Sequence, residues 1–198
     1  MGKNTKEKIL EAAFHELELS GPSFRMDDLA RRLNISKRTL YENFSSKEEI
    51  IDKVIEALQD ELYQQHLELL QDTRLTADEK LLAFFAMRIR SASRLPKHAI
   101  YDLLKKMPSL NASVCERSMR DWKLLETFVD EAQQKNLFVS FDKKLFMYML
   151  SGISKEIFNN FDDLDEYYAY PEAMEPCIRI LLNGIKKNGG TPPDENQS

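Results

Sequence analysis

The chain has 198 residues, which suits one medium domain or a small domain joined to a larger one. Apolar residues make up 42% and charged residues 31%, which favours a globular protein over a disordered one, and the scarcity of Gly and Pro excludes collagen-like and Gly/Pro-rich low-complexity chains. The net charge of −5 argues against a general nucleic-acid coat, yet residues 22–47 hold six Lys or Arg against three Asp or Glu.

The first fifty residues predict three short helices in close succession. Apolar side chains recur at helical spacing over residues 5–19, and a Gly-Pro pair ends this helix. A second helix is expected over residues 26–33, followed by Asn34, which tolerates the left-handed conformation of a tight turn. Ser36 is a good N-cap for a third helix over residues 37–43.

The remainder predicts six further helices. Ser46 and Thr76 each precede a Glu by three residues, a capping box, and they open a long helix and a helix that continues to Ile89. The other four are expected over residues 96–106, 110–135, 142–160 and 172–187. Residues 161–170 are expected to be irregular, and Pro176 is expected to delay or kink the start of the last helix.

These elements predict an all-α fold of about nine helices in two parts. An N-terminal three-helix domain is expected over residues 1–47 and a larger helical domain over residues 48–188, with a disordered tail over residues 189–198. No apolar run reaches the roughly 18–20 residues that span a bilayer, and the N-terminus lacks a stretch of signal-peptide type. We therefore expect a cytoplasmic protein.

The sequence offers little for metal, cofactor or covalent chemistry. The two cysteines lack the spacing of a zinc site or a disulfide framework, and the three histidines are scattered, so we expect no metal site and no cofactor. A nucleophilic pair of His98 and Cys115 would lack an oxyanion hole and a third orienting group. We therefore expect no enzymatic activity.

Two short helices joined by a tight turn, with the small Ala30 on the first, are typical of a helix-turn-helix. The second helix of such a motif enters the major groove and reads base edges with its N-terminal residues. Lys37 and Arg38 are placed to contact base edges or phosphate groups, and Thr39 is placed to contact a phosphate group or a thymine methyl group. Ser36 precedes them as the N-cap. Tyr41 and Lys47 are expected to contact the DNA phosphate backbone beside the groove. The alternative is that these residues simply form the solvent-exposed face of a small helical domain.

Four segments near the N-terminus carry a family pattern: Ile9-Leu10-Glu11-Ala12-Ala13, Asp28-Leu29-Ala30, Ile35 to Phe44 and Ser46-Lys47-Glu48-Glu49. Together they resemble the N-terminal domain of the TetR (tetracycline-repressor-like) family of bacterial regulators. The resemblance covers about residues 6–50. Phe24 and Arg25 stand where the family often has paired Thr, so Arg25 is expected to replace a phosphate contact, and Asn34 replaces the usual Gly of the turn.

The resemblance implies all-helical homodimers whose C-terminal helices form a small-molecule pocket and whose last two helices form a four-helix dimer interface. It also implies that ligand binding moves the fourth helix and separates the recognition helices. Met and aromatic side chains can line a plastic pocket, although an ordinary core explains them as well. The candidate pocket residues are Phe84, Met87, Arg88, His98, Tyr101, Met119 and Trp122. The candidate interface residues are Phe146, Met149, Ile153, Ile157, Ile178, Leu181, Leu182 and Ile185.

These observations favour a ligand-responsive, sequence-specific DNA-binding regulator that a small molecule releases from a near-palindromic operator. Most members of the family that it resembles are repressors, so a repressor is expected. Its expected partners are double-stranded DNA, a second copy of itself and an unknown small molecule, with no membrane. It would associate with the nucleoid when bound to DNA. The alternative is a helical ligand carrier or interaction protein that does not read DNA; such a protein would not need the Lys37 to Tyr41 stretch.

Overall fold

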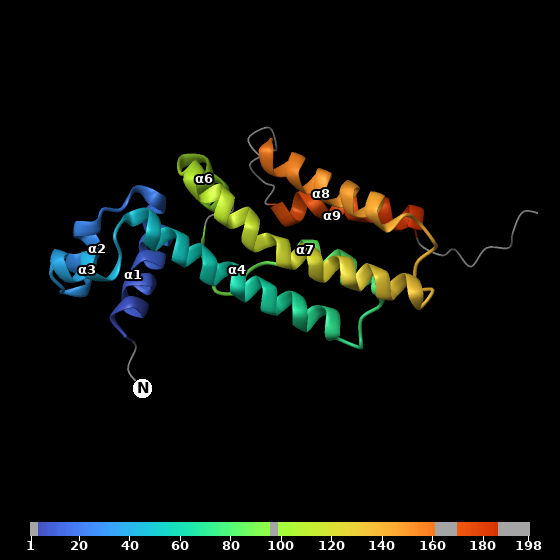
Figure 1. Cartoon of the computed structure of the whole chain (residues 1–198), viewed down its shortest axis with the longest axis horizontal. Coiled ribbons are helices and arrows are strands. Elements are labelled where there is room, and N and C mark those ends of the chain that lie inside the picture. Colours follow the sequence, from blue (N-terminus) through green and yellow to red (C-terminus); the bar gives the residue numbers. More distant parts are fainter. Residues whose placement is uncertain (1–3, 96–98, 161–169, 186–198) are drawn as a thin grey trace, which may run out of the picture.

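The computed structural model describes residues 4–95, 99–160 and 170–185, and its fold is all-α (Figure 1). The first helices are α1 (Thr5–Ser20), the short 3₁₀ turn η1 (Gly21–Ser23), α2 (Met26–Leu33) and α3 (Lys37–Asn43). They are followed by α4 (Lys47–Gln71), α5 (Ala77–Ala86), α6 (Ala99–Lys106), the 3₁₀ turn η2 (Pro108–Leu110), α7 (Asn111–Gln134), α8 (Lys143–Asn159) and α9 (Tyr170–Ile185). The nine α-helices of the described residues agree with the expected fold.

A side-chain cap begins α1, and residues with positive φ end α1 and α2. Asn4 forms a capping box with Glu7 at the start of α1, and Gly21 ends it at φ 58° and ψ −153°, a conformation that only glycine adopts without strain. Asn34 takes the left-handed conformation after α2, at φ 52° and ψ 43°. The turn that connects α2 to α3 therefore forms as its sequence predicts.

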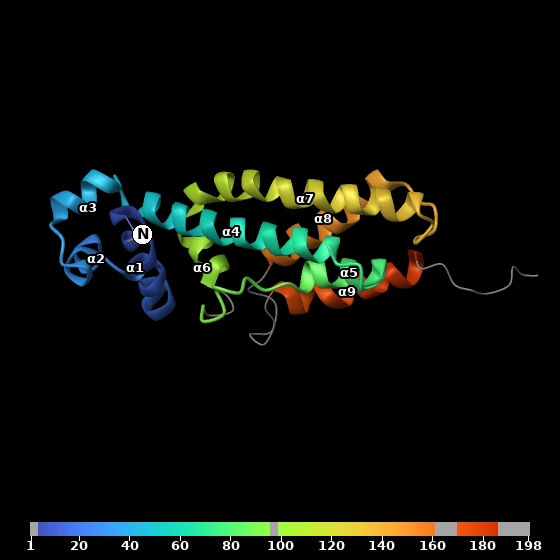
Figure 2. The ribbon, with the colours of Figure 1, turned by 90° about the horizontal axis from the view of Figure 1, so that it is seen from below.

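Helix α4 connects the two ends of the elongated molecule. Ser46 caps it by accepting a hydrogen bond from the Glu49 amide at 3.1 Å, and 25 residues follow without interruption. In Figures 1 and 2 its first turns lie beside α1–α3, and the rest runs alongside α7. A displacement of α4 would therefore move the N-terminal helices relative to the remainder.

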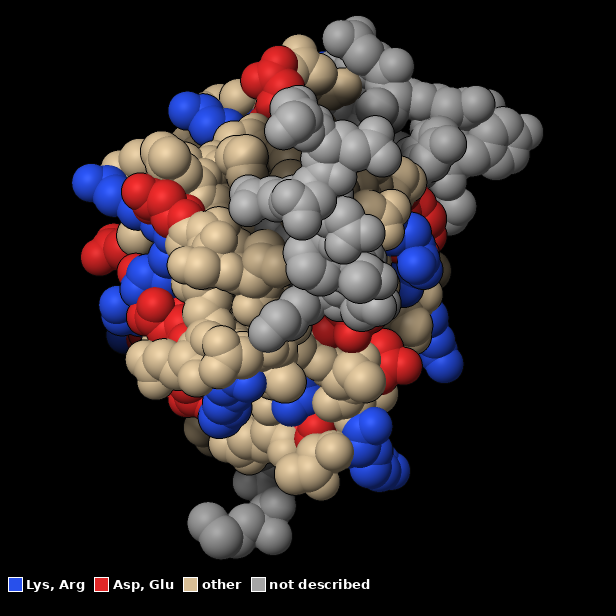
Figure 3. Space-filling model, turned by 90° about the vertical axis from the view of Figure 1, so that its right-hand side faces the viewer, with Lys and Arg blue, Asp and Glu red and all other residues tan. Residues whose placement is uncertain are grey.

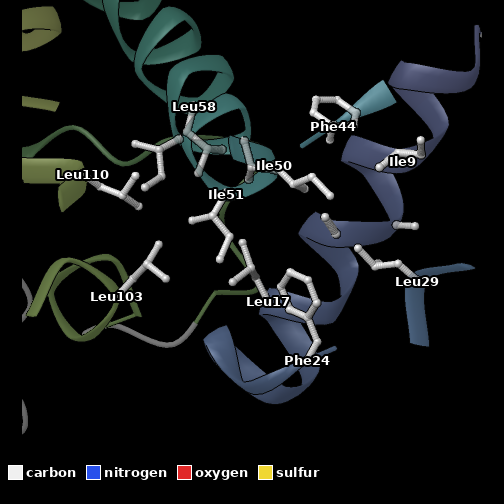
Figure 4. Close-up of a cluster of buried hydrophobic side chains, with 14 of the residues drawn as sticks. Ile9, Leu17, Phe24, Leu29, Phe44, Ile50, Ile51, Leu58, Leu103 and Leu110 are labelled. Atoms are coloured by element: carbon white, nitrogen blue, oxygen red, sulfur yellow. The ribbon is translucent and has the colours of Figure 1, made fainter. Parts of the chain in front are cut away.

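The apolar side chains form two cores. The first joins α1–α4 to α6 and η2, and Figure 4 shows Leu103 and Leu110 approaching Ile51 and Leu58 of α4. The second lies among α5, α7, α8 and α9, where Phe146 is buried. Because the first core includes α6 and η2, the N-terminal helices do not pack on α4 alone.

The structure corrects two predicted helix boundaries. Helix α5 ends at Ala86 instead of continuing to Ile89, because the chain beyond it lies extended against α4, where the buried Gln65 side chain bonds to the Arg88 carbonyl oxygen and the Arg90 amide at 3.0 and 3.1 Å. Helix α9 begins at Tyr170, and Pro176 lies inside it.

The lost N–H of Pro176 costs one helical hydrogen bond, which the burial of Met174 and Ile178 on either side offsets. Several predicted features lie outside the described residues. They are the irregular stretch apart from Tyr170, the first residues of the helix expected over 96–106, the end of the last helix beyond Ile185, and the tail. Among the helices that are described, none is both long and apolar enough to cross a bilayer.

Candidate nucleic-acid interface

The helix-turn-helix is held from the inside by small and branched side chains. Ala30 on α2 and Leu40 on α3 are buried, and the Ile35 amide donates to the Ala30 carbonyl oxygen at 3.0 Å across the turn. Phe44 follows α3 and is buried against α1 and α4 (Figure 4). This packing fixes the inner face of α3, and its opposite face stays in solvent.

The N-terminus of α3 is capped by Ser36, whose Oγ accepts from the Thr39 amide at 3.0 Å and lies 2.8 Å from the Thr39 Oγ1. The Thr39 carbonyl oxygen accepts from the Asn43 side chain at 2.8 Å. These contacts hold the predicted base-reading turn in one conformation. They also engage the Thr39 hydroxyl, so a contact from it to DNA would share or replace its contact with Ser36.

Both basic side chains of α3 are paired with carboxylates. The Lys37 Nζ lies 2.6 Å from Asp27 of α2, and the Arg38 Nε lies 2.8 Å from Glu42 of α3. The pairs are solvent-exposed, and the Arg38 side chain is 88% accessible. Exposed ion pairs contribute little net free energy, so an incoming phosphate or base can replace either carboxylate.

Tyr41 is exposed on α3, and Arg25 is exposed at the N-cap position of α2. The Arg25 backbone amide donates to Asp28 at 3.2 Å, and this contact leaves its guanidinium free to approach DNA. Five predicted contact residues, Arg25, Ser36, Lys37, Arg38 and Tyr41, are therefore exposed, and four of them belong to α3 or its cap.

Lys47 differs from the other predicted contacts because it is half-buried. Its Nζ donates to the Pro22 carbonyl oxygen at 2.7 Å and to the Phe24 carbonyl oxygen at 3.3 Å, and it lies 5.3 Å from the centre of the Phe24 ring. An ammonium has three N–H donors, so one remains for a phosphate. The structure thus gives Lys47 a positioning role that the sequence did not reveal.

The structure brings two of the predicted pocket residues, Phe84 and Trp122, into the second core and does not gather the other described ones around them. Phe84 stacks on His66 in the interior, with ring centres 3.8 Å apart, whereas Tyr101 contacts Phe158 and Met119 is 64% exposed. Met87 and Trp122 are half-buried, Arg88 pairs with Glu172, and His98 lies outside the described residues. None of the six that the structure describes lines a cavity between α1, α4 and α6.

The predicted dimer-interface residues divide between two faces. Phe146, Ile178 and Leu182 are buried in the second core, which corrects the prediction for these three because a partner could not reach them. Ile153, Ile157 and Leu181 pack against the same core but remain partly exposed. Of the eight, Met149 is exposed, and the side chain of Ile185 is not described.

The exposed stripe instead carries four residues of α8 and α9, and three of them were not predicted: Leu145, Tyr148, Met149 and Ile180. Ile180 is 72% accessible.

In the end view of Figure 3, opposite to the helix-turn-helix, Lys and Arg are interspersed with Asp and Glu among uncharged residues. The visible part of that end has no field of one sign to attract DNA.

Sequence reasoning also missed a buried polar contact in the second half of the molecule. The His66 Nδ1 lies 2.6 Å from Asp121 of α7, and its Nε2 lies 3.1 Å from the Phe84 carbonyl oxygen. The only signal was a His four residues from Leu62 on the apolar stripe of α4. Its partners are 18 and 55 residues away, so the spacing did not identify them.

Comparisons with known proteins agree with this geometry. Residues 9–54 match the family model of bacterial regulatory proteins of the tetR family. The uncharacterised HTH-type transcriptional regulator YvaF of Bacillus subtilis is 26% identical over 184 residues, which cover 90% of this chain and 94% of that protein.

Solved structures share the fold over nearly the whole chain. A transcriptional regulator from Cytophaga hutchinsonii has a TM-score of 0.71 at 18% identity, covering 91% of this chain and 98% of its own. A putative transcriptional regulator from Saccharomonospora viridis, solved in complex with choline, has a TM-score of 0.69 at 16% identity, covering 92% and 98%.

Proposed function

We propose that this chain, whose residues 9–54 match the model of the tetR family of bacterial regulatory proteins, is a homodimeric repressor that a small molecule releases from a near-palindromic operator. The observation that carries the proposal is the capped α3, whose inner face is packed while Lys37, Arg38 and Tyr41 face solvent. Such a helix fits the major groove. The protein would act in the cytoplasm, on DNA of the nucleoid.

The residues divide by the contact they would make. Lys37 and Arg38 lie in the first turn of α3 and would read base edges after leaving Asp27 and Glu42. Tyr41 and Arg25 would donate to phosphates on either side of the groove. Ser36 and Thr39 would set the first turn of α3 and offer hydroxyls to phosphate.

Dimerisation would use the exposed stripe of α8 and α9. Leu145, Tyr148 and Met149 recur at helical spacing on α8, and Ile180 is exposed on the neighbouring α9. Exposed apolar side chains grouped in this way mark an interaction surface. Two copies joined through these helices would form a four-helix interface and present two copies of α3 to successive turns of DNA.

Ligand release would work through α4. The domains would divide near residue 47, with residues 1–47 binding DNA and residues 48–188 binding ligand and partner, so α4 would connect the two events. The choline complex of the Saccharomonospora viridis regulator supports ligand binding on this fold. A ligand that binds one spacing of the two α3 helices more tightly shifts the population toward that spacing.

The test is selection of binding sites from a random duplex library at physiological salt. We expect the wild type to enrich a palindrome, Arg38→Ala to relax the preference at defined positions, and Tyr41→Phe to weaken binding to all sequences alike. Selection of no sequence by the folded wild type would contradict DNA readout and favour a helical carrier or interaction protein. Equal losses on selected and random DNA for Arg38→Ala would contradict base reading.

A further inference from the structure

A cavity of about 130 Å³ lies where the end of α1 and η1 meet α4 and α6. Its walls are mainly aliphatic, and Leu17, Leu58 and Leu103 reach it from three different helices (Figure 4). Val54 and Ile100 add further apolar side chains to the lining. This cavity is separate from the residues predicted to form a pocket among the C-terminal helices.

The size and lining define the class of molecule that fits. An engineered apolar cavity of about 150 Å³ holds one benzene, so this one suits about six non-hydrogen atoms. Its charged lining residues, Asp102 and Lys106, are exposed, stand one turn apart on α6 and have opposite signs. The pair gives no net attraction for an ion, and a neutral, mainly apolar molecule fits best.

The position of the cavity connects it to the DNA-binding helices. Pro22 lines the cavity, and its carbonyl oxygen accepts the 2.7 Å hydrogen bond from Lys47 at the start of α4. Val54 and Leu58 lie about two and about three turns further along α4. A molecule in the cavity therefore touches η1, α4 and α6 together, at the contact that positions the helix-turn-helix.

We infer that this cavity binds a neutral, mainly apolar molecule of about benzene size and that its occupation weakens DNA binding. The second half of the inference rests on the proposed function, whereas the first half does not. Occupation changes DNA affinity only if the molecule binds one arrangement of η1, α4 and α6 more tightly than another.

Fluorobenzene is a suitable probe, because ¹⁹F NMR titration reports its binding to the full chain without DNA. We expect saturable binding that Ile100→Phe, which fills the cavity, weakens at least tenfold. Val54→Leu is a milder filling variant that keeps the test valid if the larger side chain disturbs folding. Ile89→Phe is the matched control, since Ile89 is also half-buried but does not line the cavity.

DNA affinity is measured in parallel, with and without fluorobenzene. We expect the probe to raise the dissociation constant of the selected duplex at least threefold for wild type and Ile89→Phe, and to leave it unchanged for Ile100→Phe. Absence of saturable binding, or binding that survives both filling variants, would overturn the site. Binding without any effect on DNA would overturn its regulatory role. If the protein without probe selects no DNA, the proposed function fails, while the NMR result still decides the site.

Discussion

Lys47, in the first turn of α4, donates a hydrogen bond to the carbonyl oxygen of Pro22, with 2.7 Å between Nζ and that oxygen. The contact spans 25 positions of the sequence and ties the connecting helix to the segment before α2. It is a charge-assisted hydrogen bond in a half-buried place, where such contacts count for more than on the open surface. The placement of the helix-turn-helix on α4 therefore depends in part on one ammonium group.

Replacing this ammonium tests the positioning role. Lys47→Met keeps the apolar stem but leaves the Pro22 and Phe24 carbonyl oxygens without their donor. We expect the free energy of unfolding in urea to fall by about 1–2 kcal/mol and DNA binding to weaken for all sequences alike. Lys53→Met, at an exposed ion pair further along α4, is the control and should leave the stability unchanged. Equal stability of both variants and wild type would contradict the positioning role.

We expect Asp27 to compete with DNA for Lys37. Asp27→Asn removes the carboxylate that lies 2.6 Å from the Lys37 Nζ, so the ammonium no longer has to leave a partner to reach DNA. We expect binding to a random duplex to tighten by roughly three- to tenfold at low salt and to depend more steeply on salt concentration. The measurement is fluorescence anisotropy over a salt series. Glu116→Gln on α7 changes the net charge equally, and a similar gain there would show that overall charge alone is responsible.

The contact between α4 and α7 predicts a pH dependence of stability. Burial opposes ionisation of Asp52, but hydrogen bonds from Arg117 at 2.9 Å and Ser113 at 2.9 Å outweigh it and hold the pKa of this carboxyl below its ordinary value. A carboxyl with a lowered folded-state pKa stabilises the fold fully above its unfolded pKa of about 3.9. That contribution is lost as the pH falls through the folded-state pKa.

We expect Asp52→Asn to lose about 1–3 kcal/mol of unfolding free energy at pH 7, because Arg117 is left without its carboxylate partner. The difference from wild type should begin to shrink below about pH 4, where the carboxyl of the unfolded chain takes up a proton, and should shrink further as the pH falls through the lower folded-state pKa. Urea unfolding at several pH values measures it. A difference that stays constant down to pH 2 would show that the ionised form of Asp52 is not what matters.

The exposed stripe of α8 and α9 predicts the oligomeric state. Met149→Lys places a charge within this stripe, and we expect light scattering at micromolar concentration to shift from the mass of a dimer to that of a monomer. Met119→Lys is the matched control, because Met119 is also exposed but lies on α7. A wild type that is already monomeric, or equal masses for the two variants and wild type, would contradict this interface.

Local signals predicted the helix-turn-helix because its geometry depends on neighbours in the sequence. Ser36 and Ser46 cap helices within three residues, and Asn34 forms the turn on its own. The faces of α8 could not be assigned in the same way. Phe146 and Leu145 are both apolar, and periodicity does not say which of two apolar stripes meets the rest of the chain.

Long-range partners account for the other differences. The end of α5 depends on Gln65, which is more than 20 residues away and bonds to the extended chain beyond that helix. The contact of Lys47 with Pro22 and the cavity beside it likewise need the packed arrangement of α1, α4 and α6. Spacing along one helix carries no information about such contacts.

The most direct test of DNA readout is capture of genomic fragments by the purified protein at physiological salt, followed by sequencing. The Arg38→Ala/Tyr41→Phe double variant is run alongside, because both side chains are exposed and their loss should not disturb the core. We expect the wild type alone to enrich fragments that share a palindrome. Enrichment no greater than that of the variant, repeated after unfolding and refolding to remove any bound ligand, would contradict it.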